Sequence, residues 1–459
     1  MRRREFLASS TGAAAAAMGL TAGRVAHAGV ERKPNVLLVV ADDLGYGDLG
    51  CYGGEEIPTP NIDSIASNGV RFTNGYVTCP VCSPMRAGLL TGRYQQRFGH
   101  EFNPGPPDLA DPQFGLPLTE TTIADRMKAL GYATGMFGKW HLGYKPQFHP
   151  QRRGFDEFYG FLGGQHWYFD DTSRNAGDPV LRGAEPVKSY EYLTQDFARE
   201  AGAFIEKHKS HPFFCFLPFN AVHGPLQAPP EYLERFHAIA DENRRTYAGM
   251  LSAMDDGVGA VLRKLEDLEL LDDTLVVFIS DNGGPTLQTT SKNDPLRATK
   301  GSVYEGGVRV PFMMQWGTKF KKGTTIGGPA AAIDILSTAV SAAGGEIPSD
   351  WKLDGVDLVP FLTGQREGAP HETLYWRFGT QRAIRAGEWK LAQSLESKGW
   401  ELYNLDQDIG ETNDLAKENA DKVNDLQARW DAWNGTLESP RWENRQPRPN
   451  PRRQTQPAA

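Results

Sequence analysis

Residues 35–43 read NVLLVVADD, a short apolar run that ends in two acidic residues. A continuous apolar run of this length is typical of a strand that is buried on both faces of a sheet. Two later runs have the same form, FFCFL at residues 213–217 and TLVVFI at residues 274–279. These three runs predict the central strands of a buried sheet.

Segments with helical spacing lie between these runs. Thr59 is placed to cap a helix that begins at Pro60 and ends near Gly69. The longest apolar pattern at helical spacing spans residues 247–265, and a shorter one stops at Gly131. Strands that alternate with helices predict an α/β fold with a mostly parallel sheet.

The character of the sequence changes after residue 360. Short strands of an antiparallel sheet are predicted at residues 373–377, 382–385, 389–391 and 401–405. A final amphipathic helix is expected over residues 420–433. This segment therefore predicts a small α+β subdomain.

These patterns divide the chain into four parts. We expect a removable signal over residues 1–28, a large α/β domain over 29–360 and the C-terminal subdomain over 361–438. Residues 439–459 are rich in proline, arginine, glutamine and asparagine, which predicts a disordered tail.

The N-terminus has the features of an export signal. Arg3 and Arg4, followed by Phe6 and Leu7, resemble a twin-arginine (Tat) signal, and AHA at residues 26–28 has the form of a cleavage site. We therefore expect a partner in the Tat export machinery and a periplasmic or secreted protein. The alternative is a cytosolic protein with a basic, alanine-rich first helix.

The charge balance limits the classes of partner. The formal net charge is −8 at pH 7, which argues against binding nucleic acid over a broad surface. Beyond the N-terminus no stretch is apolar for long enough to cross a membrane, so we expect no stable membrane insertion. An anionic substrate would need positive charge concentrated in a pocket.

Polar side chains follow the predicted central strands. Asp42 and Asp43 end the first run, and Asp281 and Asn282 come after the third. Ligand sites in open parallel sheets form beyond the carboxyl ends of the strands, so we expect one shared site. Carboxylate and amide oxygens suit Ca²⁺ or Mg²⁺ rather than zinc. The alternative for each pair is a turn that follows a strand.

The segment CSPMR at residues 82–86 has the form of a helix start. Ser83 can act as the cap and Pro84 as the first helical residue, which would put Cys82 beside a helix N-terminus that favours an anion. Arg86 lies one turn into this helix, and its side chain can point back toward the helix N-terminus. The alternative is a buried, unreactive cysteine. Cys79 and Cys82 form a C-x-x-C, but no second pair completes a zinc site.

Six ordered motifs resemble those of the type I, formylglycine-dependent sulfatases, which belong to the alkaline phosphatase superfamily. They are NVL–DDLGYGD (35–48), CSPMRAGLLTGR (82–93), GKWHLG (138–143), VHGP (222–225), SDNG (280–283) and KG–GGVRVP (300–311). RRGFDEFYGF at residues 152–161 is similar to the arylsulfatase and N-acetylgalactosamine-6-sulfatase branch. The resemblance implies an alkaline-phosphatase-like fold, with a large mixed, mostly parallel sheet sandwiched by helices.

The resemblance also implies a metal and a modified nucleophile. Cys82 would be oxidised to formylglycine by a maturation enzyme of the host. Residue 82 would share a cation, usually Ca²⁺ with Mg²⁺ as the alternative, with four oxygen donors: Asp42, Asp43, Asp281 and Asn282.

The cationic residues of these motifs receive roles by the same resemblance. Lys139 and Lys300 would contact sulfate, and Arg86 would hold the formylglycine. His223 would protonate the departing alcohol, and His141 would deprotonate the aldehyde hydrate so that it releases sulfate.

The implied activity is hydrolysis of a carbohydrate or aryl sulfate ester. Residues 165–171, QHWYFDD, mix aromatic and hydrogen-bonding groups, so we expect this stretch, with His166, to bind the alcohol part of the substrate. The alternative is a loop packed on the core. Two other functions stay open: a phosphoester or phosphonate hydrolase of the same superfamily, and a non-catalytic sulfated-glycan-binding protein whose Cys82 is unmodified.

Overall fold

The computed structural model describes residues 33–105, 113–170, 177–317 and 319–443. The predicted export signal and the part of the predicted tail beyond residue 443 lie outside the described residues. Among the helices of the described residues, none is both long enough and apolar enough to cross a membrane.

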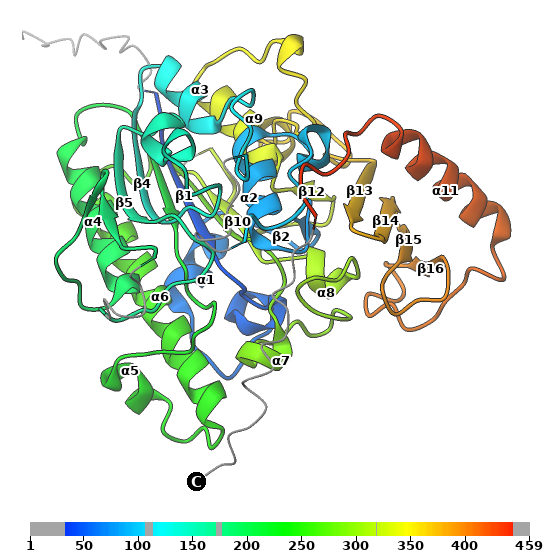
Figure 1. The fold of residues 1–459 in the computed structure, drawn as a ribbon, viewed down its shortest axis with the longest axis horizontal. Helices are drawn as coiled ribbons and strands as arrows, with labels where there is room; N and C mark the ends of the chain where they lie inside the picture. Colours follow the sequence, from blue (N-terminus) through cyan, green and yellow to red (C-terminus); the bar gives the residue numbers. More distant parts are fainter. Residues whose placement is uncertain (1–32, 106–112, 171–176, 318, 444–459) are drawn as a thin grey trace, which may run out of the picture. The chain divides into compact units, whose positions relative to one another are not determined.

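A mixed sheet of ten strands forms the centre of the fold, in the order β11-β2-β10-β9-β1-β8-β4-β5-β6-β7 (Figure 1). The strands are β1 (Asn35–Ala41), β2 (Val70–Phe72), β4 (Ala133–Lys139), β5 (Glu157–Phe161), β6 (Leu181–Arg182), β7 (Glu185–Pro186), β8 (Phe213–Pro218), β9 (Thr274–Ser280), β10 (Phe312–Gln315) and β11 (Thr324–Ile326). The five strands β9, β1, β8, β4 and β5 run parallel to one another. The predicted α/β fold with a large, mostly parallel sheet is confirmed.

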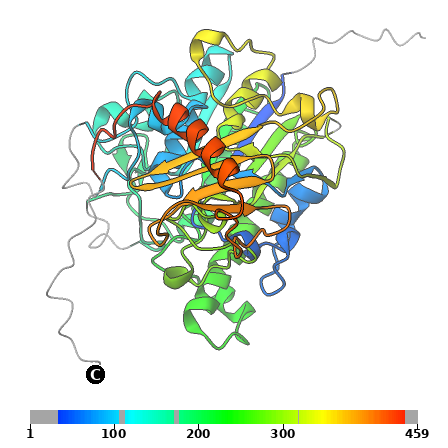
Figure 2. The ribbon, with the colours of Figure 1, turned by 90° about the vertical axis from the view of Figure 1, so that its right-hand side faces the viewer.

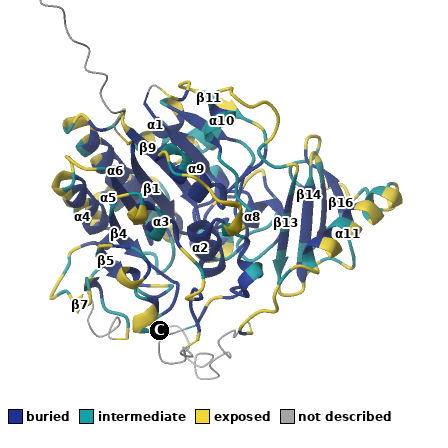
Figure 3. Cartoon of the chain, turned by 90° about the horizontal axis from the view of Figure 1, so that it is seen from above, coloured by how far each residue is buried: buried dark blue, intermediate teal, exposed yellow. Residues whose placement is uncertain are grey.

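Helices cover both faces of this sheet. Successive side chains of β1 point to opposite faces, so each face has its own apolar core. Val36 and Leu38 face the core that includes α2 (Cys82–Thr91), α3 (Ile123–Ala129) and α9 (Asp334–Ala342). Leu37 and Val39 face the core that includes α1 (Pro60–Ser67), α4 (Leu193–Lys207) and α6 (Glu242–Asp267). Figure 3 shows the central strands buried between these helices.

The connections contain shorter elements. The helices are α5 (Pro230–Arg235), α7 (Thr286–Thr289), α8 (Glu305–Val308) and α10 (Val359–Leu362), and a two-stranded sheet joins β3 (Gly75–Tyr76) to β12 (Ala330–Ala331). Single 3₁₀ turns lie at Tyr46–Asp48, Gly50–Tyr52, Gln95–Phe98, Pro146–Phe148, Pro150–Arg152 and Ser349–Trp351. Helix α1 begins at Pro60 as predicted, but the Thr59 hydroxyl accepts a hydrogen bond from the Gly50 amide and does not cap the helix.

The C-terminal part forms the predicted antiparallel sheet, β13 (Thr373–Phe378), β14 (Gln381–Ala386), β15 (Trp389–Gln393) and β16 (Glu401–Asn404). Helix α11 (Ala420–Asn434) lies across it (Figure 2). The buried Trp376 donates its indole N–H to the carbonyl of Val77, 2.7 Å away. The apolar side chains of this sheet thereby continue one of the two cores of the large sheet.

The chain continues in contact with the protein past the predicted start of the tail at residue 439. The amide of Arg441 donates to the carbonyl of Gly99 at 2.9 Å, and the Trp442 side chain is 6% exposed. An indole that buries this much apolar surface keeps its segment against the protein. The first residues of the predicted tail are therefore packed.

Candidate active site

The carboxyl ends of β1 and β9 bring two acidic pairs together. The strands are parallel neighbours in which Ala41 aligns with Ser280, so the residues that follow each strand meet at one edge of the sheet. The Asp43 amide donates to Asp281 Oδ1 at 3.2 Å, and Asn282 Nδ2 donates to Asp43 Oδ1 at 2.7 Å. All four polar side chains that were expected to converge, Asp42 included, are buried here.

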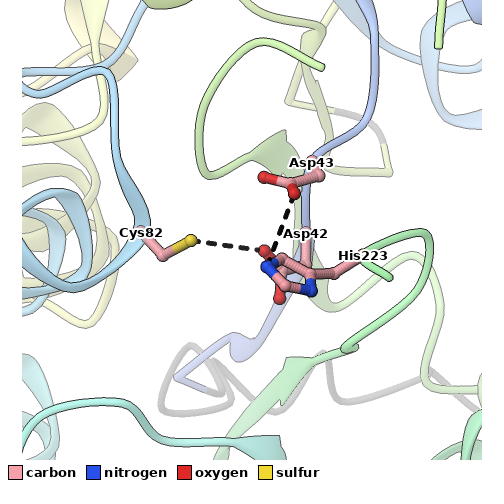
Figure 4. Close-up of side chains that lie close together, drawn as sticks. All are labelled: Asp42, Asp43, Cys82 and His223. Atoms are coloured by element: carbon pink, nitrogen blue, oxygen red, sulfur yellow. Dashed lines mark hydrogen bonds and ion pairs between the residues drawn. The ribbon is translucent and has the colours of Figure 1, made fainter. Parts of the chain in front are cut away.

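Cys82 lies on the other side of this cluster, at the start of α2. Its Sγ is 3.6 Å from Asp42 Oδ1 and 3.1 Å from Lys300 Nζ. Ligand atoms of Cys82, Asp42, Asp43 and His223 all lie within 4.8 Å of one another (Figure 4). Three separate parts of the chain therefore meet at the side chain of residue 82.

The start of α2 differs in detail from the sequence prediction. Cys82 is itself the first helical residue and Val81 occupies the cap position, without a side-chain cap. The hydroxyl of Ser83 does not cap the helix. It lies 2.7 Å from Nε2 of His100 instead. Cys82 still lies in the first turn, where free backbone amides favour an anion.

Arg86 points back across α2 as its position one turn in predicts. Its Nε and Nη2 donate to Asp281 Oδ2 at 3.1 and 2.8 Å, and Nη1 donates to the carbonyl of Lys139 at 3.0 Å. Burial would lower the pKa of this guanidinium, but Asp281 and Asp42 raise it above its ordinary value. Arg86 therefore ties the helix to the acidic cluster as a permanent cation.

Two lysines complete the charge balance of the cluster. Lys139 Nζ lies 2.5 Å from Asp42 Oδ2, and Lys300 Nζ lies 2.5 Å from Asp43 Oδ1. Burial would lower the pKa of Lys300, but Asp43 and the other anionic groups hold it well above its ordinary value. Three cations, Arg86, Lys139 and Lys300, are thus gathered in one buried place, each paired with a carboxylate.

Attraction to these cations sets the charge of two of the carboxylates. Burial would raise the pKa of Asp42, but the neighbouring Lys139 lowers it below its ordinary value. Burial would likewise raise the pKa of Asp43, but Lys300 lowers it. Both groups are therefore anionic at neutral pH.

The two histidines of the cluster are neutral at pH 7. Burial lowers the pKa of His141 well below its ordinary value, and Lys139 and Arg86 lower it further. Burial also lowers the pKa of His223, although Asp43 and Asp42 oppose the shift. His141 Nδ1 is buried without a hydrogen-bond partner, and His223 Nε2 lies 3.6 Å from Asp43 Oδ2. Both rings can therefore exchange a proton with a group bound beside them.

The cluster fits a hard divalent cation. Asp42, Asp43 and Asp281 offer carboxylate oxygens, and Asn282 Oδ1 is buried without a hydrogen-bond partner. A buried amide oxygen without a donor is costly unless another group binds it, and a cation does so. An all-oxygen set of this kind suits Ca²⁺ or Mg²⁺.

A free thiol at residue 82 is a weak nucleophile in this environment. Burial raises the pKa of Cys82 to about 12, and Lys139 and Lys300 only partly oppose the shift. Since the thiolate is the reactive form, the unmodified side chain has little nucleophilic character at neutral pH. All four cysteines lie in the described part of the chain and are free thiols: Cys51, Cys79, Cys82 and Cys215.

A cavity of about 640 Å³ opens onto the cluster. Asp43, His223 and Lys300 form its charged end. The rest of the lining is apolar or neutral and comes from several loops: Val81, Phe102, Asn103, Gln165, Gly224, Pro225, Pro285, Gln288, Thr289, Gly301, Phe378 and Leu395. This size and composition are typical of a small-molecule or sugar site.

The structure does not bring His166 into this cavity. Its side chain is buried, with Nδ1 2.7 Å from the carbonyl of Trp167 and Nε2 3.0 Å from the carbonyl of Asp178. The ring also packs against Phe161, with centroids 4.7 Å apart. Of the predicted stretch 165–171, Gln165 lines the cavity, and Asp171 lies outside the described residues.

Sequence reasoning missed most of the cavity wall. Phe102, Asn103, Gln288, Phe378 and Leu395 lie in segments that carry no recognisable motif. Their place depends on how loops from distant parts of the chain fold over the sheet edge, so no local pattern could have identified them.

Two family models match the chain. The model "Sulfatase" matches residues 34–345, and the model "N-sulphoglucosamine sulphohydrolase, C-terminal" matches residues 299–432. Together they cover the large sheet, the acidic cluster and the C-terminal sheet.

Known proteins are similar over most of the chain. N-acetylgalactosamine-6-sulfatase of Homo sapiens is 34% identical over 396 residues, which cover 82% of this chain and 74% of that protein. Arylsulfatase A of Homo sapiens is 35% identical over 378 residues, covering 76% of this chain and 71% of that protein.

A solved structure is also similar in fold. The structure titled "Ps i-CgsB in complex with k-i-k-neocarrahexaose" superposes with a TM-score of 0.86 and 37% identity, covering 90% of this chain and 95% of that one. Family model, relatives and solved structure all agree with the resemblance that the six motifs carry. This chain belongs to the sulfatase family and is a sulfuric ester hydrolase.

Proposed function

We propose that this enzyme releases sulfate from a sulfated carbohydrate, with a formylglycine made from Cys82 as its nucleophile. The observation that carries the proposal is the position of the Cys82 side chain, within 4.8 Å of ligand atoms of Asp42, Asp43 and His223 and 3.1 Å from Lys300. A carbohydrate substrate is supported by the neocarrahexaose bound in the similar structure and by the name of the human N-acetylgalactosamine-6-sulfatase.

Asp42, Asp43, Asp281 and Asn282 would hold Ca²⁺ beside residue 82, with Mg²⁺ as the alternative. Bound there, the cation would balance the charge of the carboxylates and attract the oxygens of a sulfate group. The buried, unpartnered Oδ1 of Asn282 supports this assignment.

The first step is transfer of the sulfuryl group to residue 82. A hydroxyl of the hydrated formylglycine attacks the sulfur, and the bond from sulfur to the sugar oxygen breaks. Lys139 and Lys300 balance the charge of the sulfate oxygens, and Arg86 holds the α2 helix start in place. The attacking hydroxyl loses its proton, and the neutral ring of His223 would take up one proton and pass it to the departing sugar oxygen.

The second step restores the enzyme. His141 removes the proton of the second hydroxyl of residue 82, whose oxygen then forms the aldehyde double bond while the bond to the sulfate oxygen breaks. A cysteine or serine has no second hydroxyl on the same carbon and could not release sulfate in this way. This difference is the chemical reason for modifying Cys82.

The proposal requires two partners of this enzyme. A formylglycine-generating enzyme would have to oxidise Cys82, and the Tat machinery would export the chain to the periplasm or the medium. Because Tat substrates are exported folded, oxidation would precede export, while the chain is still in the cytoplasm.

Mass spectrometry of the peptide that contains Cys82 tests the modification. Conversion of the thiol to an aldehyde lowers the peptide mass by about 18 Da. Co-expression with a formylglycine-generating enzyme should raise the converted fraction and the sulfatase activity in proportion, whereas Cys82→Ala should be inactive under both conditions. An unshifted peptide in fully active protein would contradict the proposal.

Paired substrates test the class of reaction. The converted enzyme should turn over sulfated oligosaccharides faster than the matching phosphate esters. The described residues form one candidate metal cluster, without a second ligand set for the further metal that a dianionic phosphate would favour. Faster turnover of the phosphate would favour the phosphoester alternative. Binding of sulfated glycans without sulfate release by converted protein would favour the non-catalytic alternative.

A further inference from the structure

A short segment after helix α11 runs back to the catalytic part of the chain. We call residues 438–442 the C-terminal strap. The amide and Nε of Arg441 donate to the carbonyls of Gly99 and Phe98, both at 2.9 Å. Gly99 fits closely against the strap, since a Cβ there would lie 2.7 Å from the carbonyl oxygen of Ser439. The strap thus fixes the backbone of residues 98–103, which we call the pocket segment.

Trp442 makes the central contact of the strap. Its indole N–H donates to the carbonyls of Phe102 and Asn103, at 3.0 and 3.3 Å. The indole ring stacks on Phe114, with centroids 5.0 Å apart, and meets the ring of His100 edge-on at 4.8 Å. One buried side chain therefore holds the carbonyls of two successive residues of the pocket segment.

These two residues form part of the wall of the substrate cavity. The Phe102 ring packs against Phe378 of the C-terminal sheet, with centroids 5.5 Å apart, and both line the cavity. Asn103 lines the cavity too, and its Oδ1 accepts a hydrogen bond from the Ser83 amide at 3.1 Å. A shift of the pocket segment would therefore change the shape of the neutral end of the cavity.

The charged end of the cavity is held differently. Lys139 and Lys300 are fixed by ion pairs to Asp42 and Asp43, and Arg86 is fixed by Asp281. In the proposed mechanism these groups would surround the sulfate, whereas the pocket segment would face the group that carries it. The two ends of the cavity are therefore held mainly by different contacts, and they are linked through Ser83 at the start of α2.

We propose that Trp442 is a positioning residue for substrate binding. Through the carbonyls of Phe102 and Asn103 it sets the wall against which the sulfate-bearing group lies. The placement of the sulfate at the charged end and the choice of a carbohydrate as the group that carries it both rest on the function proposed above. The strap thereby gives the end of the chain a part in substrate affinity.

The test compares Trp442→Phe and Trp442→Ala with the wild type. Trp430→Phe is the matched control, because Trp430 is equally buried and donates its indole N–H to the Trp376 carbonyl at 3.0 Å, on α11 rather than in the strap. Each protein is assayed on a small aryl ester, 4-nitrophenyl sulfate, and on the sulfated oligosaccharide that the wild type cleaves fastest. Thermal melts report the stability of each variant.

Trp442→Phe keeps the ring stacking and loses the hydrogen bonds. We expect its KM for the oligosaccharide to rise about three- to tenfold, the size of one lost net hydrogen bond, with little change in kcat. Its kcat/KM for 4-nitrophenyl sulfate should change by less than about twofold, because the small ester depends on the charged end of the cavity. Trp442→Ala should raise the oligosaccharide KM further, and Trp430→Phe should leave both substrates unaffected.

An equal loss on both substrates in Trp442→Phe, or no loss on either, would overturn the proposal. If Trp442→Ala does not fold, the result for Trp442→Phe alone tests the positioning role of Trp442. A wild type that cleaves no sulfated oligosaccharide contradicts the proposed carbohydrate substrate. The positioning role is then tested with 4-methylumbelliferyl sulfate as the larger substrate, and a KM effect confined to that substrate supports it.

Discussion

Gly164 lies directly against the ring of the proposed base His141. A Cβ built at residue 164 would lie 2.4 Å from His141 Nε2, closer than any real contact, so a side chain here must displace the ring. His141 itself has a positive φ of 60°, which leaves its backbone little freedom to follow. Gly164→Ala should therefore lower kcat by about tenfold to a hundredfold, the usual effect of misplacing a catalytic group by an ångström.

The control for this change is Gly399→Ala. A Cβ at residue 399 meets nothing within 4 Å, and its φ does not require glycine. Steady-state kinetics and a thermal melt of both variants separate the local effect from a loss of folding. A Gly164→Ala enzyme with normal kcat would show that the His141 ring is not held where the site needs it.

Asn282 gives a direct test of the cation site. Its Oδ1 is the buried oxygen that has no hydrogen-bond partner, and its Nδ2 is bound to Asp43. Asn282→Leu removes this oxygen, and we expect the affinity for Ca²⁺ to fall by at least about tenfold in calorimetric titration of the purified protein. Asn413→Leu is the control, because it makes the same change at an exposed position in the C-terminal part of the chain. Unchanged Ca²⁺ binding in Asn282→Leu would remove this residue from the ligand set.

At the scale of elements, a buried ionic cluster joins the C-terminal sheet to the catalytic part. Lys390 on β15 lies 2.8 Å from Glu305 at the start of α8 and 2.9 Å from Glu411, and all three side chains are buried. Removing one member of such a cluster leaves an unpaired buried charge, which costs about 3–5 kcal/mol. The cluster therefore fixes β15 and α8 relative to each other.

Glu411 makes this junction sensitive to pH. Burial raises its pKa to about 7, with repulsion from Glu305 adding to the shift and Lys390 opposing it. The folded state thus binds this proton more tightly than the unfolded state does. Stability from Glu411 is full below the unfolded pKa, near 4.5, and is lost as the pH rises toward 7.

Glu411→Gln removes this proton equilibrium without changing the shape of the side chain. We expect the stability of the wild type, measured relative to the variant by urea unfolding, to fall between about pH 4.5 and pH 7, where the unfolded glutamate is ionised and the native one still holds its proton, and to level off above pH 7. Glu418→Gln on the surface is the control. A difference between wild type and variant that does not change with pH would contradict the raised pKa of Glu411.

At the scale of the whole molecule, the two sheets share one apolar core. Trp376 and Leu391 of the C-terminal sheet belong to the same buried cluster as Val77 and Leu89 of the catalytic part. Neither part can open without exposing apolar surface of the other. The two predicted domains are therefore expected to unfold together.

Differential scanning calorimetry of the mature chain tests this expectation. We expect a single transition, with a calorimetric enthalpy equal to the van't Hoff enthalpy. Lys390→Met should lower the midpoint of that transition without splitting it, whereas Lys398→Met, on an exposed loop, should leave it unchanged. Two separate transitions in the wild type would show that the C-terminal part unfolds independently.

Local sequence patterns determined the elements and the charged end of the site. The buried strands 35–41 and 274–280 are identified by their apolar runs, and the acidic residues after them must converge because parallel neighbours end at one edge. The sequence likewise predicted that Arg86 lies one turn into a helix that starts beside Cys82, although the structure begins this helix at Cys82 itself. These features follow from backbone geometry that repeats in every protein, so the sequence by itself determined them.

Only the tertiary structure decided the shape of the neutral end of the cavity and the hydrogen-bond partners of several side chains. Ser83 pairs with His100, His166 bonds to backbone carbonyls, and Trp442 holds the pocket segment. Each of these contacts joins residues whose separation in sequence carries no information about their distance in space. They form because distant loops fill the same volume at close packing, which the chain reaches only when it is folded.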